Sequence, residues 1–376
     1  MQFTMSTRIT SAGNILLALV CLFASSPSVG AFLPLATFRN GASLERGTAL
    51  NAIGVLARKA KEASLRKYAE AGIEDDVRAK VEEMKAALQS EGTTGESLQA
   101  WMAGPLQQAL TKRKGTITVI AEYKRKLENS AIIDFDKFNP EILSPVFREF
   151  GASAVAVMAD EAMGGATYDD VRDFANEQEG AKGDMPGPLP VISNDLIVDE
   201  LQLAQSAAAG VSAVVVTMSA VGPERCAELK RCANALGLET IVAVSSAEEA
   251  RDAVSSEIGA TIISVVGLDG FEAKCEVIAG LEISDDDSTK VCTIANILAK
   301  DNKALEEVEE AWILRDRGFN AVWVSDALYK SGADPTEHPG AIINSMKAKS
   351  SVKWASPKAR SGKGEGAREY LGDIMM

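Results

Sequence analysis

The sequence predicts an α/β fold, a (β/α)8 TIM barrel with an N-terminal helical extension. Four expected helices end in a glycine that is followed by small and β-branched residues, at Gly151, Gly210, Gly259 and Gly318. Glycine favours the left-handed helix cap, and a run of this kind is typical of a strand buried on both faces. Together with these four, further buried runs bring the number of expected strands to eight: 118–121, 189–192, 240–244 and 290–294.

Amphipathic helices are expected between these strands, at 201–209, 223–236, 247–257 and 304–317. The spacing between the four glycines corresponds to two strand–helix units, and eight units within roughly 230 residues favour a barrel. A doubly wound sheet is the alternative. It would carry a glycine-rich phosphate turn after its first strand, and residues 118–126 contain no glycine. In a barrel, the functional residues follow the carboxyl ends of the strands.

The first fifty residues are expected to be a targeting sequence. Arg8 precedes an apolar run at 15–24 that is too short for a permanent membrane span, and small residues lead to a cleavage site near Ala31. Residues 1–31 are therefore expected to be a signal peptide. Residues 32–50, rich in small and hydroxylated residues, resemble the transit part of bipartite plastid-targeting sequences of algae with complex plastids. We expect import into the plastid (chloroplast stroma), with secretion as the alternative.

Three segments follow the targeting sequence. Residues 51–115 show charged, amphipathic helical patterns and are expected to pack across one end of the barrel. The barrel itself is expected over residues 116–348. Residues 349–376 place lysine and arginine among serine and glycine, so we expect a disordered basic tail that offers a site for a protein partner.

Composition excludes several classes of function. The net charge of −14 and the lack of a basic stripe in the barrel argue against nucleic-acid binding. The five cysteines show no metal-ligand spacing and are interpreted as buried small residues in a reducing compartment, with a disulfide framework as the alternative. His338 is the single histidine, which argues against a Ser-His-Asp triad and a multi-histidine metal site. We expect no cofactor, no metal and no integral membrane segment in the mature chain.

Residues 118–126 contain the main candidate site. This strand is apolar along its length and charged at its carboxyl end, a pattern that indicates buried sides and a tip that opens into a cavity. Because side chains two apart share a face of a strand, Glu122 and Lys124 should point the same way, with Lys126 continuing the line if the strand persists. Such an opposite-charge pair would hold a small anionic substrate; a structural ion pair is the alternative.

Residues 119–126, Val-Ile-Ala-Glu-Tyr-Lys-Arg-Lys, resemble the first-strand signature of the indole-3-glycerol-phosphate synthase family, the barrel lyases of tryptophan biosynthesis. Further stretches fit the same family in order, at 151–155, 160–161, 164–165, 190–200 and 236–240. The resemblance covers about residues 55–347. It implies a metal-free decarboxylating ring closure of carboxyphenylamino-deoxyribulose phosphate, a small phosphorylated substrate. It also implies that Glu122 and Lys124 are catalytic, with Lys124 holding the substrate carboxylate or helping to protonate.

Elsewhere the sequence departs from the family pattern at the positions that carry chemistry. Asn194 stands in place of a lysine that serves as general acid, and Ala243 in place of a glutamate. Val266 and Leu268 stand in place of an Asn and an Arg, and residues 294–296 in place of a Glu-Ser-Gly. Ser325-Asp326 replaces the Gly-Ser step that binds phosphate, and Leu127 replaces a serine. Asn194 and Ser325 remain as candidate substrate-binding residues. We expect a pseudoenzyme with impaired or lost catalysis; normal catalysis, a non-catalytic binding or scaffold barrel in the plastid, and a different reaction remain alternatives.

Overall fold

The computed structural model describes residues 43–94, 104–111, 116–127, 131–281, 291–300, 305–329 and 339–348. All of them belong to one compact unit, residues 40–376. The predicted signal peptide, the basic tail and His338 lie outside the described residues, as does most of the transit-like segment 32–50. Helix α2 begins at Ser43, within that segment.

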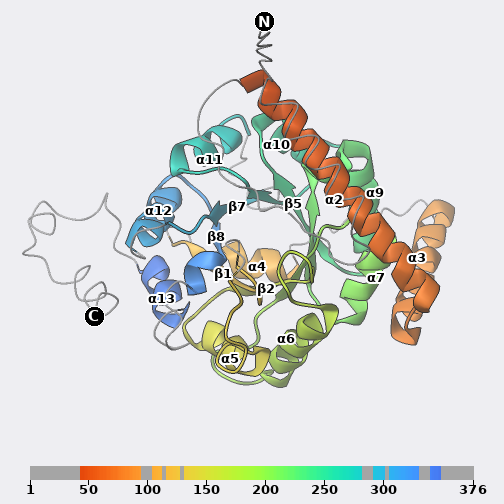
Figure 1. The fold of residues 1–376 in the computed structure, drawn as a ribbon, viewed down its shortest axis with the longest axis horizontal. Coiled ribbons are helices and arrows are strands. Elements are labelled where there is room, and N and C mark those ends of the chain that lie inside the picture. Colours follow the sequence, from red (N-terminus) through yellow and green to blue (C-terminus); the bar gives the residue numbers. More distant parts are fainter. Residues whose placement is uncertain are drawn as a thin grey trace, which may run out of the picture. The chain divides into compact units, whose positions relative to one another are not determined.

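Eight strands form a closed parallel barrel in sequence order (Figure 1). They are β1 Thr118–Tyr123, β2 Ala154–Met158, β3 Val191–Asn194, β4 Ala213–Thr217, β5 Glu239–Val244, β6 Ile262–Val265, β7 Cys292–Ile297 and β8 Ala321–Val324. The barrel closes between β1 and β8, where Ile120 lies beside Trp323. The predicted TIM barrel is confirmed, and the doubly wound alternative is excluded.

Helices surround the barrel in the expected alternation (Figure 1). They are α5 Pro140–Glu149, α6 Tyr168–Gly180, α7 Glu200–Ala208, α8 Met218–Val221, α9 Pro223–Ala235, α10 Ala247–Val254, α11 Phe271–Ile278, α12 Leu305–Asp316 and α13 Ala341–Lys347, with a 3-10 helix η1 at Asp326–Tyr329. The four predicted cap glycines, Gly151 among them, have φ between +59° and +97°. Gly151, Gly210 and Gly318 follow the ends of α5, α7 and α12 as predicted, whereas α10 ends at Val254, before Gly259, so the cap prediction is wrong for Gly259.

Strand β3 begins at Val191, two residues later than the sequence predicts. Pro190 has no amide hydrogen for the sheet, and only its carbonyl joins the ladder by accepting from the Val155 amide at 3.1 Å. Strand β7 is likewise displaced toward Ile297. These shifts move the carboxyl ends of both strands, and therefore the residues that reach the barrel mouth.

The barrel has two apolar layers because neighbouring side chains of each strand point to opposite faces. The outer layer packs beneath the helices. The inner layer consists mostly of small and aliphatic residues that fill the barrel, such as Ile120, Ala154, Ala156, Ile192, Ala213, Ile241, Ala243, Ile262, Cys292, Ile294 and Ala321. The interior is thus a packed core that leaves space only at its ends.

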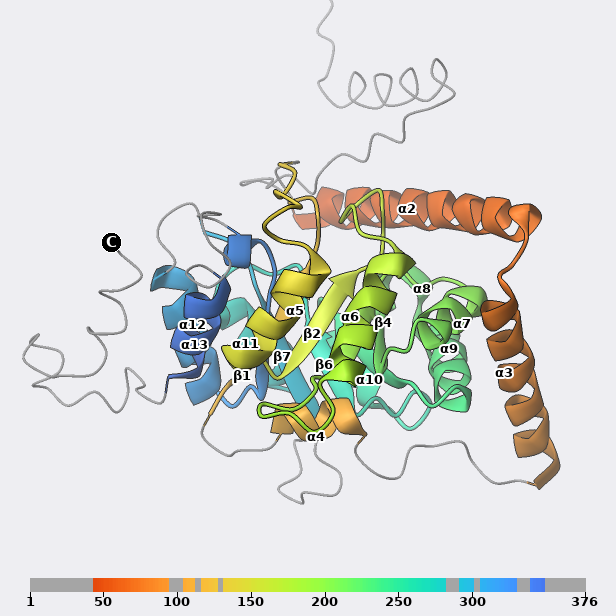
Figure 2. The same ribbon diagram turned by 90° about the horizontal axis from the view of Figure 1, so that it is seen from below.

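Helix α4, Pro105–Thr111, closes the amino-terminal end of the barrel (Figure 2). Its Leu106 and Leu110 side chains are fully buried in the inner layer. The Glu239 carboxylate accepts the Leu106 amide at 2.6 Å and the Gln107 amide at 3.0 Å, which satisfies the free amides of the first helical turn. A Cβ on Gly104 would lie 2.4 Å from the Glu239 side chain, so this contact requires glycine.

Helix α2, Ser43–Ala71, lies across the carboxyl-terminal end of the barrel (Figure 2). Helix α3, Asp75–Thr94, packs instead along the side of the barrel, against α7 and α9, and buries Val77 and Met84. Helices α2 and α4 therefore cover opposite ends of the barrel and α3 covers its side, so the prediction that the whole extension packs across one end is wrong. Helical periodicity shows which face of a helix is apolar, but not which surface of the barrel that face covers.

Candidate functional site

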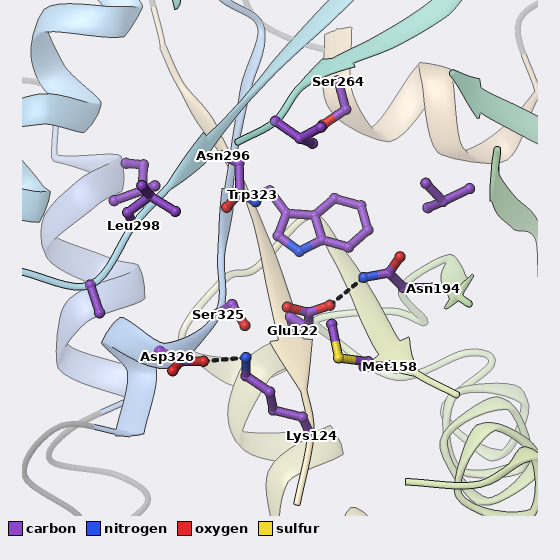
Figure 3. Close-up of a pocket in the computed structure, with 14 residues that line it drawn as sticks. Glu122, Lys124, Met158, Asn194, Ser264, Asn296, Leu298, Trp323, Ser325 and Asp326 are labelled. Carbon is purple, nitrogen blue, oxygen red and sulfur yellow. Dashed lines mark hydrogen bonds and ion pairs between the residues drawn. The ribbon is translucent and has the colours of Figure 1, made fainter. Parts of the chain in front are cut away.

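A cavity of about 100 Å³ opens at the carboxyl-terminal end of the strands (Figure 3). All four predicted site residues line it: Glu122, Lys124, Asn194 and Ser325. The other lining residues come from β2, β4 and β6 to β8 and the turns that follow, and include Met158, Val215, Ser264, Val266, Asn296, Leu298, Trp323 and Asp326. The topology thus brings the predicted residues together at the mouth of the barrel.

The side-chain amide of Asn194 holds the Glu122 carboxylate in place. Its side chain is only 2% exposed, and its Oε1 accepts a hydrogen bond from the Asn194 Nδ2 at 2.6 Å. The Tyr329 hydroxyl donates to the Glu122 backbone carbonyl at 2.8 Å, which fixes the end of β1. The family resemblance assigns a general acid to position 194. A carboxamide occupies it here and serves as a partner of the carboxylate, since it cannot give up a proton near neutral pH.

Lys124 forms an ion pair with Asp326, the first residue of η1 (Figure 3). Both side chains are largely buried, at 4% and 12% exposed. Glu122 and Lys124 line the same cavity, as expected, but the alternative of a structural ion pair between them is wrong, because each has a different partner. In a closed barrel β8 lies beside β1, which brings the carboxylate that follows β8 to the lysine that follows β1.

Lys126 does not continue the line of Glu122 and Lys124. Strand β1 ends at Tyr123, and Lys126 forms an isolated bridge with Ile132 while its ammonium donates to the Ala162 carbonyl at 3.3 Å. Lys126 is absent from the lining of the cavity. Lys124 is thus the single cation among the described lining residues.

Trp323 occupies the centre of the mouth. It lies on the inward face of β8, between Ala321 and Ser325, and is 5% exposed. Figure 3 shows its indole projecting into the middle of the site, with Glu122 and Asn194 on one side of the ring. A large aromatic side chain at this position explains why the cavity is small. No expectation from the sequence included Trp323, although its spacing of two from Ser325 places it on the same face of the strand.

The structure separates the replaced family positions into two groups. Val266, which follows β6, and Asn296, near the carboxyl end of β7, line the cavity. Ala243 is 3% exposed and belongs to the inner core, outside the lining. Leu268 packs against the outer core and also lies outside the lining, so neither Ala243 nor Leu268 forms part of the mouth.

A second charged cluster joins α2 to the barrel. The Lys61 ammonium lies 2.5 Å from Asp195 and 3.0 Å from Asp160, which follow β3 and β2. Asp195 is fully buried and also accepts from the Gln202 side chain at 2.7 Å and the Tyr168 hydroxyl at 3.2 Å. Burial opposes the charged form of Lys61, but the two carboxylates outweigh it and raise the pKa of Lys61.

Removing this lysine should destabilise the fold. We expect Lys61→Met to lower the free energy of unfolding by about 3 kcal/mol at pH 7, because it leaves Asp195 as a buried charge without its cation. Burial raises the pKa of Asp195, so the ion pair requires a pH at which that carboxyl is ionised; on the alkaline side, the raised pKa of Lys61 means that the contribution is present below pH 10.5 and is lost as the pH rises through the folded pKa. Urea denaturation measures the effect, with Lys59→Met, an exposed position on the same helix, as the matched control. Equal stability of the two variants would contradict the proposed role of Lys61.

The described residues contain no group of three or more His, Cys, Asp or Glu that could hold a metal ion. Cys226, Cys232 and Cys292 are buried, Cys275 is partly buried, and these four are free. The prediction of buried cysteines is therefore confirmed for Cys226, Cys232 and Cys292 and only in part for Cys275, whereas Cys21 lies outside the described residues. Within the described ranges, no helix is long and apolar enough to cross a membrane.

Comparison with known proteins relates the whole barrel to one family. The family model for Indole-3-glycerol phosphate synthase matches residues 70–333. The chain is 30% identical over 160 residues to the indole-3-glycerol phosphate synthase of Leptospira interrogans, which covers 43% of this chain and 58% of that protein. It is 34% identical over 131 residues to the protein of the same name from Bacteroides thetaiotaomicron, covering 35% and 46%. It is 26% identical over 255 residues to that of Listeria monocytogenes, covering 65% and 92%.

The first two of these alignments span about half the length of the curated relatives. The family model extends from within the extension, through the eight strands, to the residues that follow β8. It includes Glu122 and Lys124 on the first strand as well as the replaced positions at the mouth. The barrel, the N-terminal extension and the first-strand residues all agree with this match. The chain therefore belongs to the indole-3-glycerol phosphate synthase family.

Proposed function

We propose that this chain is an indole-3-glycerol phosphate synthase family barrel that has lost most of its activity in the decarboxylating ring closure and retains the barrel mouth as a binding site. The observation that carries the proposal is the ion pair between Lys124 and Asp326. The family reaction requires a cation that is available to the substrate carboxylate. Here the single cation of the lining is already paired with a carboxylate of the protein.

Two groups that the family resemblance expects for proton transfer are replaced as well. An amide occupies position 194 and hydrogen-bonds Glu122, and a methyl side chain occupies position 243 inside the inner core. One general acid or base contributes roughly 10²- to 10⁴-fold to a rate. Losing the acid and the base together should therefore reduce the rate drastically, even though such contributions do not simply add.

The size and charge of the mouth also disfavour the family substrate. A cavity of about 100 Å³ is small beside the roughly 300–1,000 Å³ typical of ligand pockets. Asp326 adds a negative charge at the step where the family binds a phosphate group, and like charges repel strongly at a partly buried site. The substrate implied by the family would need space that Trp323 fills and a positive field that Asp326 cancels.

The test is a direct assay of the complete chain with carboxyphenylamino-deoxyribulose phosphate, following indole glycerol phosphate by its fluorescence. We expect formation at least about 10³-fold slower than that of an active family member under the same conditions. Circular dichroism and a cooperative thermal transition confirm that the chain is folded. Turnover at an ordinary enzymatic rate would reject the proposal.

We further propose that the protein acts in the plastid. The support is the sequence of residues 1–50, in which a signal-peptide pattern precedes a segment rich in small and hydroxylated residues. Fusing residues 1–50 to a fluorescent protein in an alga with complex plastids tests this location. Fluorescence in the medium would favour secretion instead.

A further inference from the structure

Glu122 lacks the cation that a buried carboxylate normally has. It is 2% exposed, and among the described residues no lysine or arginine forms an ion pair with it. Asn194 supplies one hydrogen bond to Oε1. A carboxylate can accept about four hydrogen bonds, and buried carboxylates are rarely found without a positive partner. The mouth therefore contains a negative group with unused acceptor capacity.

The charges around the cavity favour a positive ligand. The charged lining residues are Glu122, Lys124 and Asp326, two carboxylates and one ammonium, which gives a net charge of −1. Lys124 and Asp326 largely neutralise one another within their ion pair. What remains is the field of Glu122, which attracts cations and repels phosphates and carboxylates in a poorly hydrated site.

The other walls suit an organic cation better than a metal ion. Met158, Val215, Val266 and Leu298 present apolar surface to the cavity, and the Trp323 indole stands beside Glu122 (Figure 3). The face of an indole attracts an ammonium group, most strongly where water is excluded. A metal ion would need several oxygen, nitrogen or sulfur ligands, and no such group of ionisable side chains occurs in the described part of the chain.

We propose that the mouth of the barrel binds a small protonated amine, with its ammonium between Glu122 and the Trp323 indole and its apolar part against the aliphatic lining residues. The Asn194 amide donates to Glu122 through Nδ2 and leaves its carbonyl oxygen to accept a second ammonium hydrogen. A cavity of about 100 Å³ holds roughly seven to ten atoms of the size of a water molecule, which limits the ligand to a short monoamine. This inference rests on the proposed function, because a mouth that held the phosphorylated substrate would have to favour anions.

The experiment titrates the complete chain with three probes of nearly equal shape and different charge: n-butylammonium chloride, 1-butanol and sodium butyrate. Ligand-observed NMR at constant ionic strength measures the affinities. We expect n-butylammonium to bind with a Kd on the order of 1 mM. The neutral and anionic probes should bind at least tenfold more weakly, because only the cation interacts favourably with Glu122.

Two variants locate the site. Glu122→Gln keeps the shape of the side chain and should weaken n-butylammonium binding at least tenfold, whereas Trp323→Phe should weaken it about threefold by reducing the cation–π contribution. The matched control is Glu272→Gln, which removes the same charge from an exposed position on α11 and should leave binding unchanged within twofold.

The outcomes separate this inference from the proposed function. Equal binding of butyrate and n-butylammonium, an unchanged affinity in a folded Glu122→Gln chain, or no binding at 50 mM n-butylammonium would each overturn the amine site. None of these results bears on whether the chain turns over carboxyphenylamino-deoxyribulose phosphate. The ring-closure assay alone decides the proposed function, and the titration alone decides the ligand.

Discussion

A variant with Asn194→Lys, Ala243→Glu, Ser325→Gly, Asp326→Ser and Trp323→Leu should form indole glycerol phosphate at least about 10²-fold faster than the natural chain. The first two changes supply the general acid and the carboxylate that the family resemblance places after β3 and on β5. The next two restore the glycine-serine step after β8 and free Lys124 from its ion pair. The last removes the indole that fills the mouth. The fluorescence assay measures the gain.

The set also tests which obstacle matters. Asn194→Lys, Ala243→Glu and Ser325→Gly alone should recover little activity, because Lys124 stays paired with Asp326 and Trp323 stays in the cavity. Adding Lys124→Ala to the five changes should abolish the gain if Lys124 binds the substrate carboxylate. A folded five-residue variant without any increase in rate would show that the barrel geometry no longer fits the family reaction.

The sequence alone predicts the barrel because its signals are local. Gly151, Gly210 and Gly318 each follow the end of their own helix, and each buried run lies within a single strand, so these boundaries can be recognised separately. The predicted start of β3 is two residues too early, because Pro190 has no amide hydrogen for the sheet. The packing positions of the extension helices cannot be predicted in the same way, because helical periodicity does not identify the surface that α3 covers.

The partners of the site residues depend on contacts between distant parts of the chain. Lys124 and Asp326 are about 200 residues apart, and closure of the barrel between β8 and β1 brings them together. Spacing within β1 places Glu122 and Lys124 on one face, but side chains that share a face need not pair when a third group lies closer. Alternation along β8 contains the information for Trp323, because Ser325 already marks the inward face. Lys61 gives no comparable signal, since its role depends on where α2 crosses the barrel.

Asp326→Asn should convert the mouth into an anion site and make the fold depend on the anion. The substitution leaves Lys124, 3% exposed, without its carboxylate, and we expect a loss of about 3 kcal/mol in the free energy of unfolding. An added phosphate ion should then take the place of the carboxylate. At a concentration ten times its Kd, phosphate would restore about 1.4 kcal/mol. Thermal unfolding of the natural chain and the variant, with and without phosphate, measures both effects.

The comparison depends on where the released lysine lies. In Asp269→Asn, the control, Lys300 also loses an aspartate, but Asp269 is 77% exposed, Lys300 keeps Glu310 at 3.5 Å, and the lost pair contributes about 0–1 kcal/mol. We therefore expect phosphate to raise the melting temperature of Asp326→Asn by about 2 °C or more and to leave the natural chain and Asp269→Asn unchanged. Equal shifts in all three chains would mean that phosphate acts on the general surface. No destabilisation in Asp326→Asn would mean that the carboxylate does not neutralise Lys124, and the loss of the family's cation would need another explanation.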